Sequence, residues 1–398
     1  MDESLKDDPP DYEENFNPAG GEDVAAKHAE MRARCPVAHV AANGAHFWAL
    51  TRHEDVLRAA RDPVVFANGK RPRFAGRRPP LESDPPEHAE WRKLMTPFFA
   101  PRYIESFEPV SRQITGDLVG PLIAAGGGDV AHDLARPLPP QVLLSFLGQP
   151  KEDWAPIKAW CEDAYFDRSS DPQDRKIFAT SNDALWDYSR KAVGERRKTP
   201  RDPERDLITA LLAGTKERGT EGEELVAGVI RLLLAAGHDS TTSAMSICLH
   251  YLARHPEDQA RLRAEPALIR PAIEEILRFE TPVIAMPRMV AQDVEIGGRE
   301  LKAGDRAMLY FASANRDGSA FAEPDRCLID RKPNPHLAFG LGIHACIGAP
   351  LARQEIRVAL EELLARSSEF GLAGPVTHEF WHPYGVRQLP LWIKPRSG

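Results

Sequence analysis

Apolar residues recur with a helical period along most of the middle of the chain. From Glu87 to about residue 280 this pattern is interrupted only at Pro and Gly clusters such as AAGGGDV and RKTPRDPERD. Near the C-terminus, IGAPLARQEIRVALEELLAR places its apolar residues on one side of a helix that starts near Ile347: Ile347, Leu351, Ile356, Leu360 and Leu364. These patterns predict a mainly helical protein.

Two stretches favour strands instead. FWALTRHEDVLRAAR predicts a short strand that leads into a helix, and DVEIGGRELKAGD alternates around Gly-Gly as a β-hairpin does. Residues 66–86 are rich in Pro, Gly and Arg and predict a long loop. The fold class is therefore mainly α with a minor β portion. Because no clean linker divides the chain, we expect one domain over residues 19–398, preceded by a disordered acidic lead over residues 1–18.

Composition narrows the function. The chain has 398 residues and a net charge of -8, which argues against a general nucleic-acid binder. No apolar run is long enough for a membrane span, and the acidic N-terminus does not have the pattern of a signal peptide. The five cysteines are few and far apart, so we expect a cytoplasmic protein without disulfides or a structural zinc site.

The stretch HLAFGLGIHACIGAPLA, residues 336–352, holds one cysteine among three glycines. GLGIHA satisfies the loose dinucleotide-binding pattern, but no strand precedes it, and a lone cysteine is most often a small buried hydrophobe. Gly340, Gly342 and Gly348 permit a tight turn around Cys346. The predicted helix after it would point its N-terminus at the thiol, and such a thiolate is a good axial ligand for haem iron.

FGLGIHACIG resembles the haem-binding loop of the cytochrome P450 monooxygenases, F-x-x-G-x-x-x-C-x-G. Phe339, Gly342, Cys346 and Gly348 fill that pattern. The resemblance implies the P450 fold, with a long central helix over haem b, and Cys346 as the ligand of the iron. It also implies that Phe339 shields the sulfur and that Gly348 lies against the haem.

EEILR supplies a second match in the expected order. Glu275 and Arg278 are three residues apart, so they share one helix face and can form an ion pair. Ion pairs of this kind occur on many exposed helices. The resemblance implies instead a structural pair that stabilises the core around the haem.

LLLAAGHDSTTSA combines an apolar helix with Gly, an acid and four hydroxyl residues. A Gly and back-bonded hydroxyls can open the hydrogen-bond ladder of a helix, although the stretch could also be a helix with a polar patch. It resembles the oxygen-activation motif of the family, with Ser240 where Thr is usual. The resemblance implies that Ala236 contacts the haem, that Ser240 donates a hydrogen bond and that Asp239 relays protons for O–O cleavage.

The same resemblance implies which basic residues bind the haem propionates. His88 and Arg92 are four apart in HAEWR and would share a helix face, which could equally be a solvated side. Arg288 in MPRMV and His344 in the cysteine loop complete the implied set. Arginine binds carboxylates with bidentate geometry.

The resemblance implies a monooxygenase that uses O2 and two electrons to hydroxylate or O-demethylate a small organic substrate. No flavin or nicotinamide motif is convincing, so a ferredoxin or flavodoxin with its NAD(P)H reductase would supply electrons. That partner would dock on a basic face around Arg92 and Lys93. We expect a monomer without membrane or nucleic-acid partners. A peroxide-driven peroxygenase and a non-catalytic haem-based ligand sensor remain as alternatives.

The sequence encodes the substrate poorly. By resemblance, the pocket is lined by the 66–83 loop and by residues from three further segments: Leu234, Ala235, Val283, Ile284, Ala285, Trp381 and Tyr384. The aromatic residues Phe380, Trp381 and Tyr384 permit stacking on an aromatic substrate or are part of the core. The basic loop KRPRFAGRR could attract a carboxylate or be merely solvated.

Overall fold

The computed structural model describes six stretches of the chain, which are 9–13, 23–42, 45–68, 76–163, 172–379 and 383–396. These stretches form two compact units, each assembled from segments that are distant in sequence. The first unit comprises Met1–Arg71, Ile247–Cys346 and Thr377–Arg387, and the second Pro72–Ser246, Ile347–Val376 and Gln388–Gly398. Helices dominate and strands are a minority, as the fold-class prediction requires. The single domain over residues 19–398 stays a prediction.

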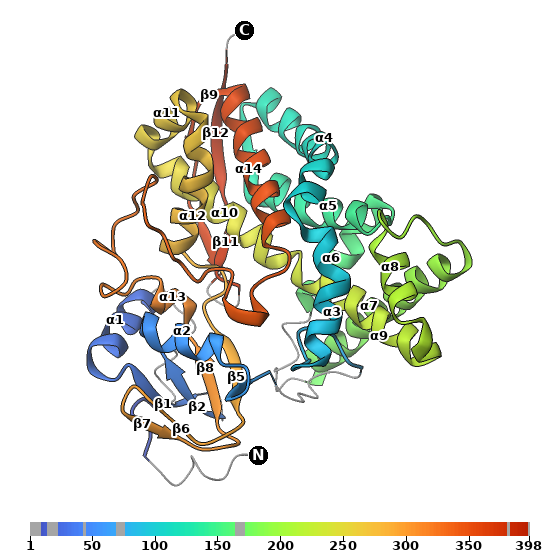
Figure 1. The fold of residues 1–398 in the computed structure, drawn as a ribbon. Helices are drawn as coiled ribbons and strands as arrows, with labels where there is room; N and C mark the ends of the chain where they lie inside the picture. Colours follow the sequence, from blue (N-terminus) through green and yellow to red (C-terminus); the bar gives the residue numbers. More distant parts are fainter. Residues whose placement is uncertain are drawn as a thin grey trace. The chain divides into compact units, whose positions relative to one another are not determined.

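The first unit is built on a five-stranded sheet (Figure 1). Its order is β1-β2-β8-β5-β3, and β2 and β8 are its parallel pair. The strands are β1 (Val37–Ala42), β2 (Ala45–Leu50), β3 (Phe66–Ala67), β5 (Met286–Val290) and β8 (Arg306–Leu309). This unit also contains the helices α1 (Val24–Arg34), α2 (His53–Arg61), α11 (Pro256–Ala264), α12 (Ile269–Phe279) and α13 (Phe311–Ala314). The predicted strand that leads into a helix is confirmed as β2 and α2.

The predicted hairpin is also confirmed. β6 (Val294–Ile296) pairs antiparallel with β7 (Arg299–Leu301). Gly297 and Gly298 between them have φ angles of 55° and 74°, which glycine adopts without the clash that a Cβ causes. A second short pair joins β10 (Thr377–Glu379) and β11 (Gly385–Gln388).

The second unit is a helical assembly with a small sheet. Its helices are α3 (Glu87–Met95), α4 (Pro101–Ala125), α5 (Leu138–Phe146), α6 (Trp154–Glu162), α7 (Pro172–Lys198), α8 (Leu207–Gly214), α9 (Gly219–Ala236) and α14 (Ala349–Arg366). The sheet has the order β4-β12-β9, from Gly127–Asp129, Pro390–Pro395 and Ser367–Leu372. Helix α10 (Asp239–Arg254) belongs to both units. Short helical turns are η2 (Thr96–Phe99), η3 (Ala131–Ala135), η4 (Lys151–Asp153), η6 (Lys216–Arg218), η7 (Pro266–Leu268) and η8 (Gly342–His344).

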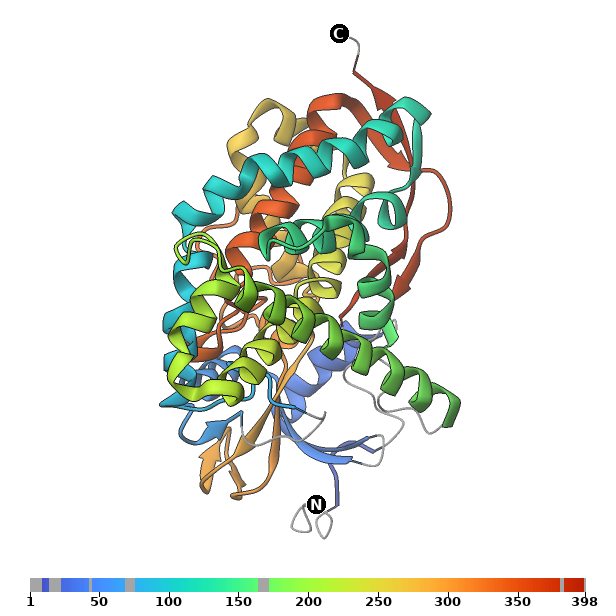
Figure 2. The ribbon, with the colours of Figure 1, turned by 90° about the vertical axis from the view of Figure 1, so that its right-hand side faces the viewer.

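Helix α14 packs along α4 in the second unit, and Figure 2 shows the two side by side. Leu351, Ile356, Leu360 and Leu364 are buried there, as the periodicity predicts. The helix starts near Ile347 as predicted: Ile347 lies in the turn directly before it, and the helix begins at Ala349. Pro350 explains this start, since proline is favoured in the first turn of a helix, where its missing N–H is not needed.

The predicted long central helix opens at the motif where the sequence indicated that its hydrogen-bond ladder can open. Helix α9 ends at Ala236 and α10 begins at Asp239, so Gly237 and His238 form a turn between them. Glycine is a poor helix former, and the hydroxyl of Ser240 donates to the Ala236 carbonyl oxygen over 2.9 Å. Both features favour an opening of the hydrogen-bond ladder at this place.

The disordered acidic lead is wrong for residues 9–13. The backbone N–H groups of Asp11 and Tyr12 donate to the carbonyl of His39 on β1 at 2.9 and 3.3 Å. The Asp11 carboxylate also pairs with the guanidinium of Arg299. These acidic and polar residues therefore gain partners that a charge count does not reveal. Residues 1–8 and 14–18 lie outside the described residues.

The predicted loop over residues 66–86 starts slightly later, because Phe66 and Ala67 form β3. Residues 69–75 lie outside the described residues, and 76–86 form turns without regular structure. In the described part of the chain, no helix has both the length and the apolar character needed to cross a membrane.

Candidate active site

The cysteine loop in the first unit follows η8. Gly340 and Gly342 have φ angles of 67° and 72°, and a Cβ on Gly342 would collide with the carbonyl oxygen of Ala60. The loop turns back on itself, because the Cys346 N–H donates to the Phe339 carbonyl over 2.8 Å. Cys346 is exposed, whereas the other four cysteines of the chain are buried or half-buried. Gly342 therefore fixes a turn that presents a thiol.

The backbone conformation at Gly348 does not require a glycine. Its φ is -77°, in the ordinary helical region, so the expectation that it permits the tight turn is wrong. The predicted contact of Gly348 with haem is a separate matter and stays a prediction. Phe339 is half-buried, with its ring centroid 6.4 Å from that of His336.

Two of the predicted cations lie in the same unit as the cysteine. The Asn68 amide donates to Nδ1 of His344 over 3.1 Å, which leaves the ring proton on Nε2, where it can be donated to an anion. Arg288 is buried on β5 and donates through Nη1 to the Pro287 carbonyl over 2.9 Å.

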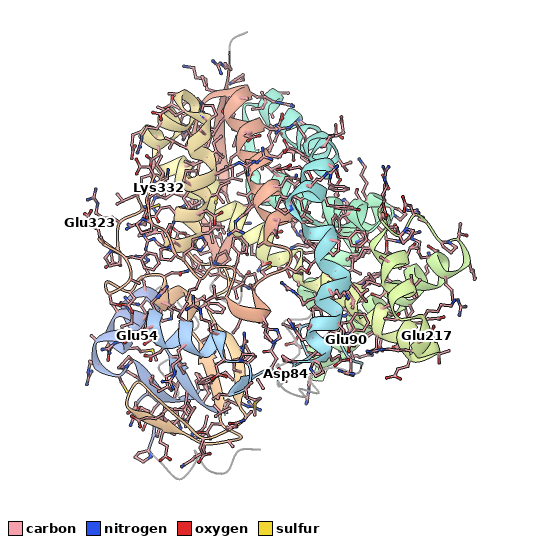
Figure 3. The ribbon with its side chains drawn as sticks, viewed as in Figure 1. Glu54, Asp84, Glu90, Glu217, Glu323 and Lys332 are labelled. Carbon is pink, nitrogen blue, oxygen red and sulfur yellow. The ribbon has the colours of Figure 1, made fainter. Side chains whose placement is uncertain are left out.

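The other two predicted cations lie on α3 in the second unit. His88 and Arg92 are one turn apart, and His88 is buried, so this side of the helix is not simply solvated. Burial, and then the positive charge of Arg92, lower the pKa of His88, and Asp84 partly opposes them. Asp84 and the exposed Glu90, labelled in Figure 3, mark the beginning and the solvent side of α3.

Glu275 and Arg278 form a fully buried ion pair on α12. The contact is bidentate, with Nε–Oε2 of 2.8 Å and Nη2–Oε1 of 2.9 Å. The remaining N–H groups of Arg278 donate to three backbone carbonyls, each over 2.8 Å: Asn315, Pro324 and Arg326. Arg331 adds a second guanidinium to Glu275, with its Nε 2.9 and 3.0 Å from the two carboxylate oxygens. No local pattern indicated Arg331, which lies 56 residues from Glu275 along the chain.

The acid and the alcohol of the second motif lie at the break between α9 and α10. Asp239 is the first residue of α10, and Ser240 follows it. Ala236 is exposed although Leu233 and Leu234 before it are buried. A small exposed residue at the end of an otherwise apolar helix suits a flat ligand at this point.

Sequence reasoning missed the partner of Asp239. Lys158 on α6 has only 3% of its side chain exposed, and its ammonium donates to Oδ1 of Asp239 in a short ion pair. Glu162, one turn further on α6, is 3.8 Å from the same ammonium. The hint in the sequence is a lysine with apolar neighbours on both sides in WAPIKAWCE.

His238, between Gly237 and Asp239, is completely buried. Neither ring nitrogen has a hydrogen-bond partner among the described residues. Burial lowers the pKa of His238 to about 3, so the ring is neutral at physiological pH.

The predicted substrate residues fall in several places. Ile284 and Ala285 belong to one buried apolar cluster of the first unit, and Tyr384 packs against that cluster, which favours the core alternative for Tyr384. Val283 packs against a second cluster of that unit. In the second unit, Leu234 is buried and Ala235 half-buried. Phe380 and Trp381 lie outside the described residues.

Comparisons with known proteins agree with one family. The cytochrome P450 family model matches residues 164–368. Cytochrome P450-SU2 of Streptomyces griseolus is 35% identical over 368 residues, which cover 88% of each chain. Nocardicin C N-oxygenase of Nocardia uniformis subsp. tsuyamanensis is 35% identical over 384 residues, 93% of this chain and 94% of that protein. The crystal structure of CYP109E1 from Bacillus megaterium with testosterone superposes with a TM-score of 0.84 at 32% identity, covering 95% of this chain and 98% of that one.

The residues present fit a haem. An exposed thiol on a loop shaped by Gly342 suits an iron ligand, and buried basic side chains suit two propionates. Together with relatives that align over nearly the full length, these features show that the chain belongs to the cytochrome P450 family and is a haem-dependent monooxygenase.

Proposed function

We propose that this enzyme hydroxylates or O-demethylates a small organic substrate, using O2 and two electrons from a ferredoxin or flavodoxin with its NAD(P)H reductase. We further propose that it works as a cytoplasmic monomer. The observation that carries the proposal is the exposed Cys346 thiol on a loop whose turn uses the positive φ angles of Gly340 and Gly342. When bound, haem activates O2 so that one oxygen atom enters the substrate, and a thiolate ligand favours O–O cleavage.

In this proposal the loop holds Cys346 ready for the iron. The hydrogen bond from the Cys346 N–H to the Phe339 carbonyl constrains the backbone that leads to Cys346. A preformed ligand loses little conformational entropy on binding. Phe339, half-buried in the same loop, would restrict the access of water to the thiolate.

Two pairs of basic residues would hold the propionates. By resemblance to the family, one pair is Arg288 and the Nε2–H of His344, and the other is His88 and Arg92. Burial strengthens a charge-assisted hydrogen bond, and both Arg288 and His88 are buried. An anionic propionate would raise the lowered pKa of His88, because it stabilises the charged ring.

Asp239 and Ser240 would control protons. The Ser240 hydroxyl donates to the Ala236 carbonyl, so its oxygen lone pairs remain to accept a hydrogen bond from a water. One oxygen of Asp239 accepts from Lys158. To take up a proton and pass it on, Asp239 would use its other oxygen or exchange Lys158 for water. Lys158 is thus a positioning residue for the acid.

The first test is the visible spectrum of the purified holoenzyme after reduction with dithionite and addition of CO. We expect the strongly red-shifted Soret band of thiolate ligation, its loss in Cys346→Ala, and its retention in the control Cys35→Ala. An imidazole-type band would favour the sensor alternative. Absence of haem after reconstitution overturns the proposal.

The second test separates partner-driven from peroxide-driven turnover. Ser240→Ala should lower the product formed per NAD(P)H consumed, while Ser240→Thr should keep or improve it, because threonine has fewer χ1 rotamers. A product yield unchanged in Ser240→Ala contradicts the role of Ser240. Efficient turnover with hydrogen peroxide alone would favour the peroxygenase alternative.

The docking face is tested by charge reversal. Lys93 is exposed on α3, so Lys93→Glu should slow reduction by an acidic ferredoxin, most strongly at low salt. Lys191→Glu, an exposed lysine on α7, is the matched control. Equal reduction rates for Lys93→Glu and wild type would show that Lys93 is not part of the docking face.

A further inference from the structure

The second unit contains a buried guanidinium that the proposed mechanism does not use. Arg231 lies in the apolar run LVAGVIRLLLAA of α9 and is only 1% exposed. Its Nη2 donates to Oδ1 of Asn182 on α7 over 3.0 Å. Nε and Nη1 have no hydrogen-bond partner among the described residues. An arginine has five N–H donors, so most of this group's capacity is unused.

The charges near Arg231 do not balance it. The largest effect of an acidic group on Arg231 is that of the Cys161 thiol, but burial raises the pKa of that thiol to about 12, so the thiol is neutral at pH 7. Arg78 adds a like charge. Glu82 acts on Arg231 as well, yet it forms a short ion pair with the guanidinium of Arg78 and accepts from the Arg78 backbone N–H over 3.0 Å. No described carboxylate forms an ion pair with Arg231.

Such an arrangement is costly in the absence of a ligand. A charge removed from water needs a counter-charge and hydrogen bonds, or it destabilises the fold. Burial lowers the pKa of Arg231 to about 10, which still leaves the group positive at neutral pH. The planar fork of arginine matches the two oxygens of a carboxylate.

The location of Arg231 connects it with the oxidation site. Leu234 and Ala235 lie one turn further along α9, and the exposed Ala236 lies five residues away, roughly 8 Å along the helix axis. One turn before Arg231, Gly228 lets the backbone at Arg77 approach α9 so closely that a Cβ would collide with its carbonyl oxygen. The guanidinium therefore belongs to the region where α7, α9 and the segment 76–82 meet.

We propose that Arg231 binds a carboxylate group of the substrate, so that the substrate is an organic acid oxidised at a carbon remote from its carboxylate. The acid would pair with Nε and Nη1, while Asn182 keeps Nη2 in place. The carbon skeleton would extend along Leu234 and Ala235 toward Ala236. This inference rests on the proposed function for the identity of the oxidation site, but not for the anion site itself.

The test measures binding to the holoenzyme by equilibrium dialysis. The probes are straight-chain and aryl-substituted carboxylates, each paired with its own methyl ester. Wild type should bind the best acids about ten- to hundred-fold more tightly than their esters, which is the range of a charged hydrogen-bonded pair. Arg231→Met should bind acid and ester equally, and Arg231→Lys should keep part of the preference. Arg190→Met, an exposed arginine on α7 that pairs with Glu224, should leave the preference unchanged.

Each outcome is decisive. Equal binding of acids and esters by wild type, binding of no acid at all, or a preference that survives in Arg231→Met overturns the inference. If Arg231→Met does not fold, Arg231→Gln removes the charge and keeps an amide that can reach Asn182, and the same comparison applies. Carboxylate binding that depends on Arg231, in a protein without the thiolate–haem spectrum, would uphold this inference and overturn the proposed function instead.

Discussion

Two arginines, each nearly inaccessible to water and each in a helix, have opposite surroundings. Arg278 on α12 of the first unit meets the two oxygens of Glu275 and three backbone carbonyls. Arg231 on α9 of the second unit meets one amide oxygen, and no ion pair reaches it from the described residues. The sequence presents both simply as a basic residue among apolar ones.

The difference separates a charge that completes the fold from a charge that is available to a ligand. Every hydrogen-bond direction of a structural guanidinium is satisfied from within the protein, so removing it leaves its partners unpaired. A binding guanidinium keeps directions open, so its removal relieves the folded protein of a desolvated charge. Lys158 falls between them, with one principal partner in Asp239.

The largest effect should come from Arg278→Met. It leaves three carbonyls and one buried carboxylate short of donors, so the free energy of unfolding should fall by about 3–5 kcal/mol. Urea unfolding of the holoenzyme measures this loss. Arg270→Met, an exposed position on the same helix, should change it by less than about 0.5 kcal/mol. A loss in Arg278→Met as small as the one in the control would show that the network is not needed for stability.

Lys158→Met should cost less, about 1–3 kcal/mol, because one mostly buried carboxylate loses one partner. Asp239→Asn added to Lys158→Met should recover most of that loss, since no charge is then left behind. A double-mutant cycle over the four proteins, followed by urea unfolding, gives the coupling energy. Strictly additive effects would show that the ion pair contributes nothing.

His238 extends the comparison to a ring that has no hydrogen-bond partner among the residues the structure describes. Its folded pKa of about 3 lies below the ordinary 6.5, so below pH 6.5 the unfolded chain binds the extra proton. Stability is therefore full above pH 6.5 and declines as the pH falls toward 3, by up to about 1.4 kcal/mol per pH unit.

His238→Phe should remove this part of the pH dependence and leave the contributions of His88 and His250, whose pKa values are also lowered by burial. Urea unfolding at a series of pH values measures how the free energy of unfolding depends on pH. The substitution His132→Gln, at an exposed position, is the control. An unchanged slope in His238→Phe would show that the ring is hydrated or charged in the folded protein.

The smallest effect, and the one of opposite sign, should come from Arg231→Met. Replacing an unbalanced buried charge by an apolar side chain of similar length should raise the free energy of unfolding of the ligand-free enzyme by about 1 kcal/mol. Arg231→Lys should bring no gain, because the charge stays. A loss of stability comparable with that in Arg278→Met would show that Arg231, like Arg278, has a structural role.

Local patterns predicted much of the fold. The β2–α2 transition, the Gly-Gly hairpin and the buried side of α14 could be predicted because each depends on neighbours within a few residues. The glycine of the cysteine loop could be predicted for the same reason, since the positive φ angle that favours glycine at Gly342 is a local property of the backbone. The sequence also indicated that the central helix can open at Gly237, whereas the residues at which α9 ends and α10 begins depend on packing as well as on propensity.

The sequence by itself determined where the cysteine loop, the Glu275–Arg278 pair and the acid–alcohol pair lie, because their members are close together along the chain. Only the tertiary structure decided what surrounds them. Arg331 reaches Glu275 across 56 residues, Lys158 reaches Asp239 across 81, and Asn182 meets Arg231 across 49. A charge becomes structural or available according to the partners that folding brings to it, and those partners come from segments that no local pattern connects.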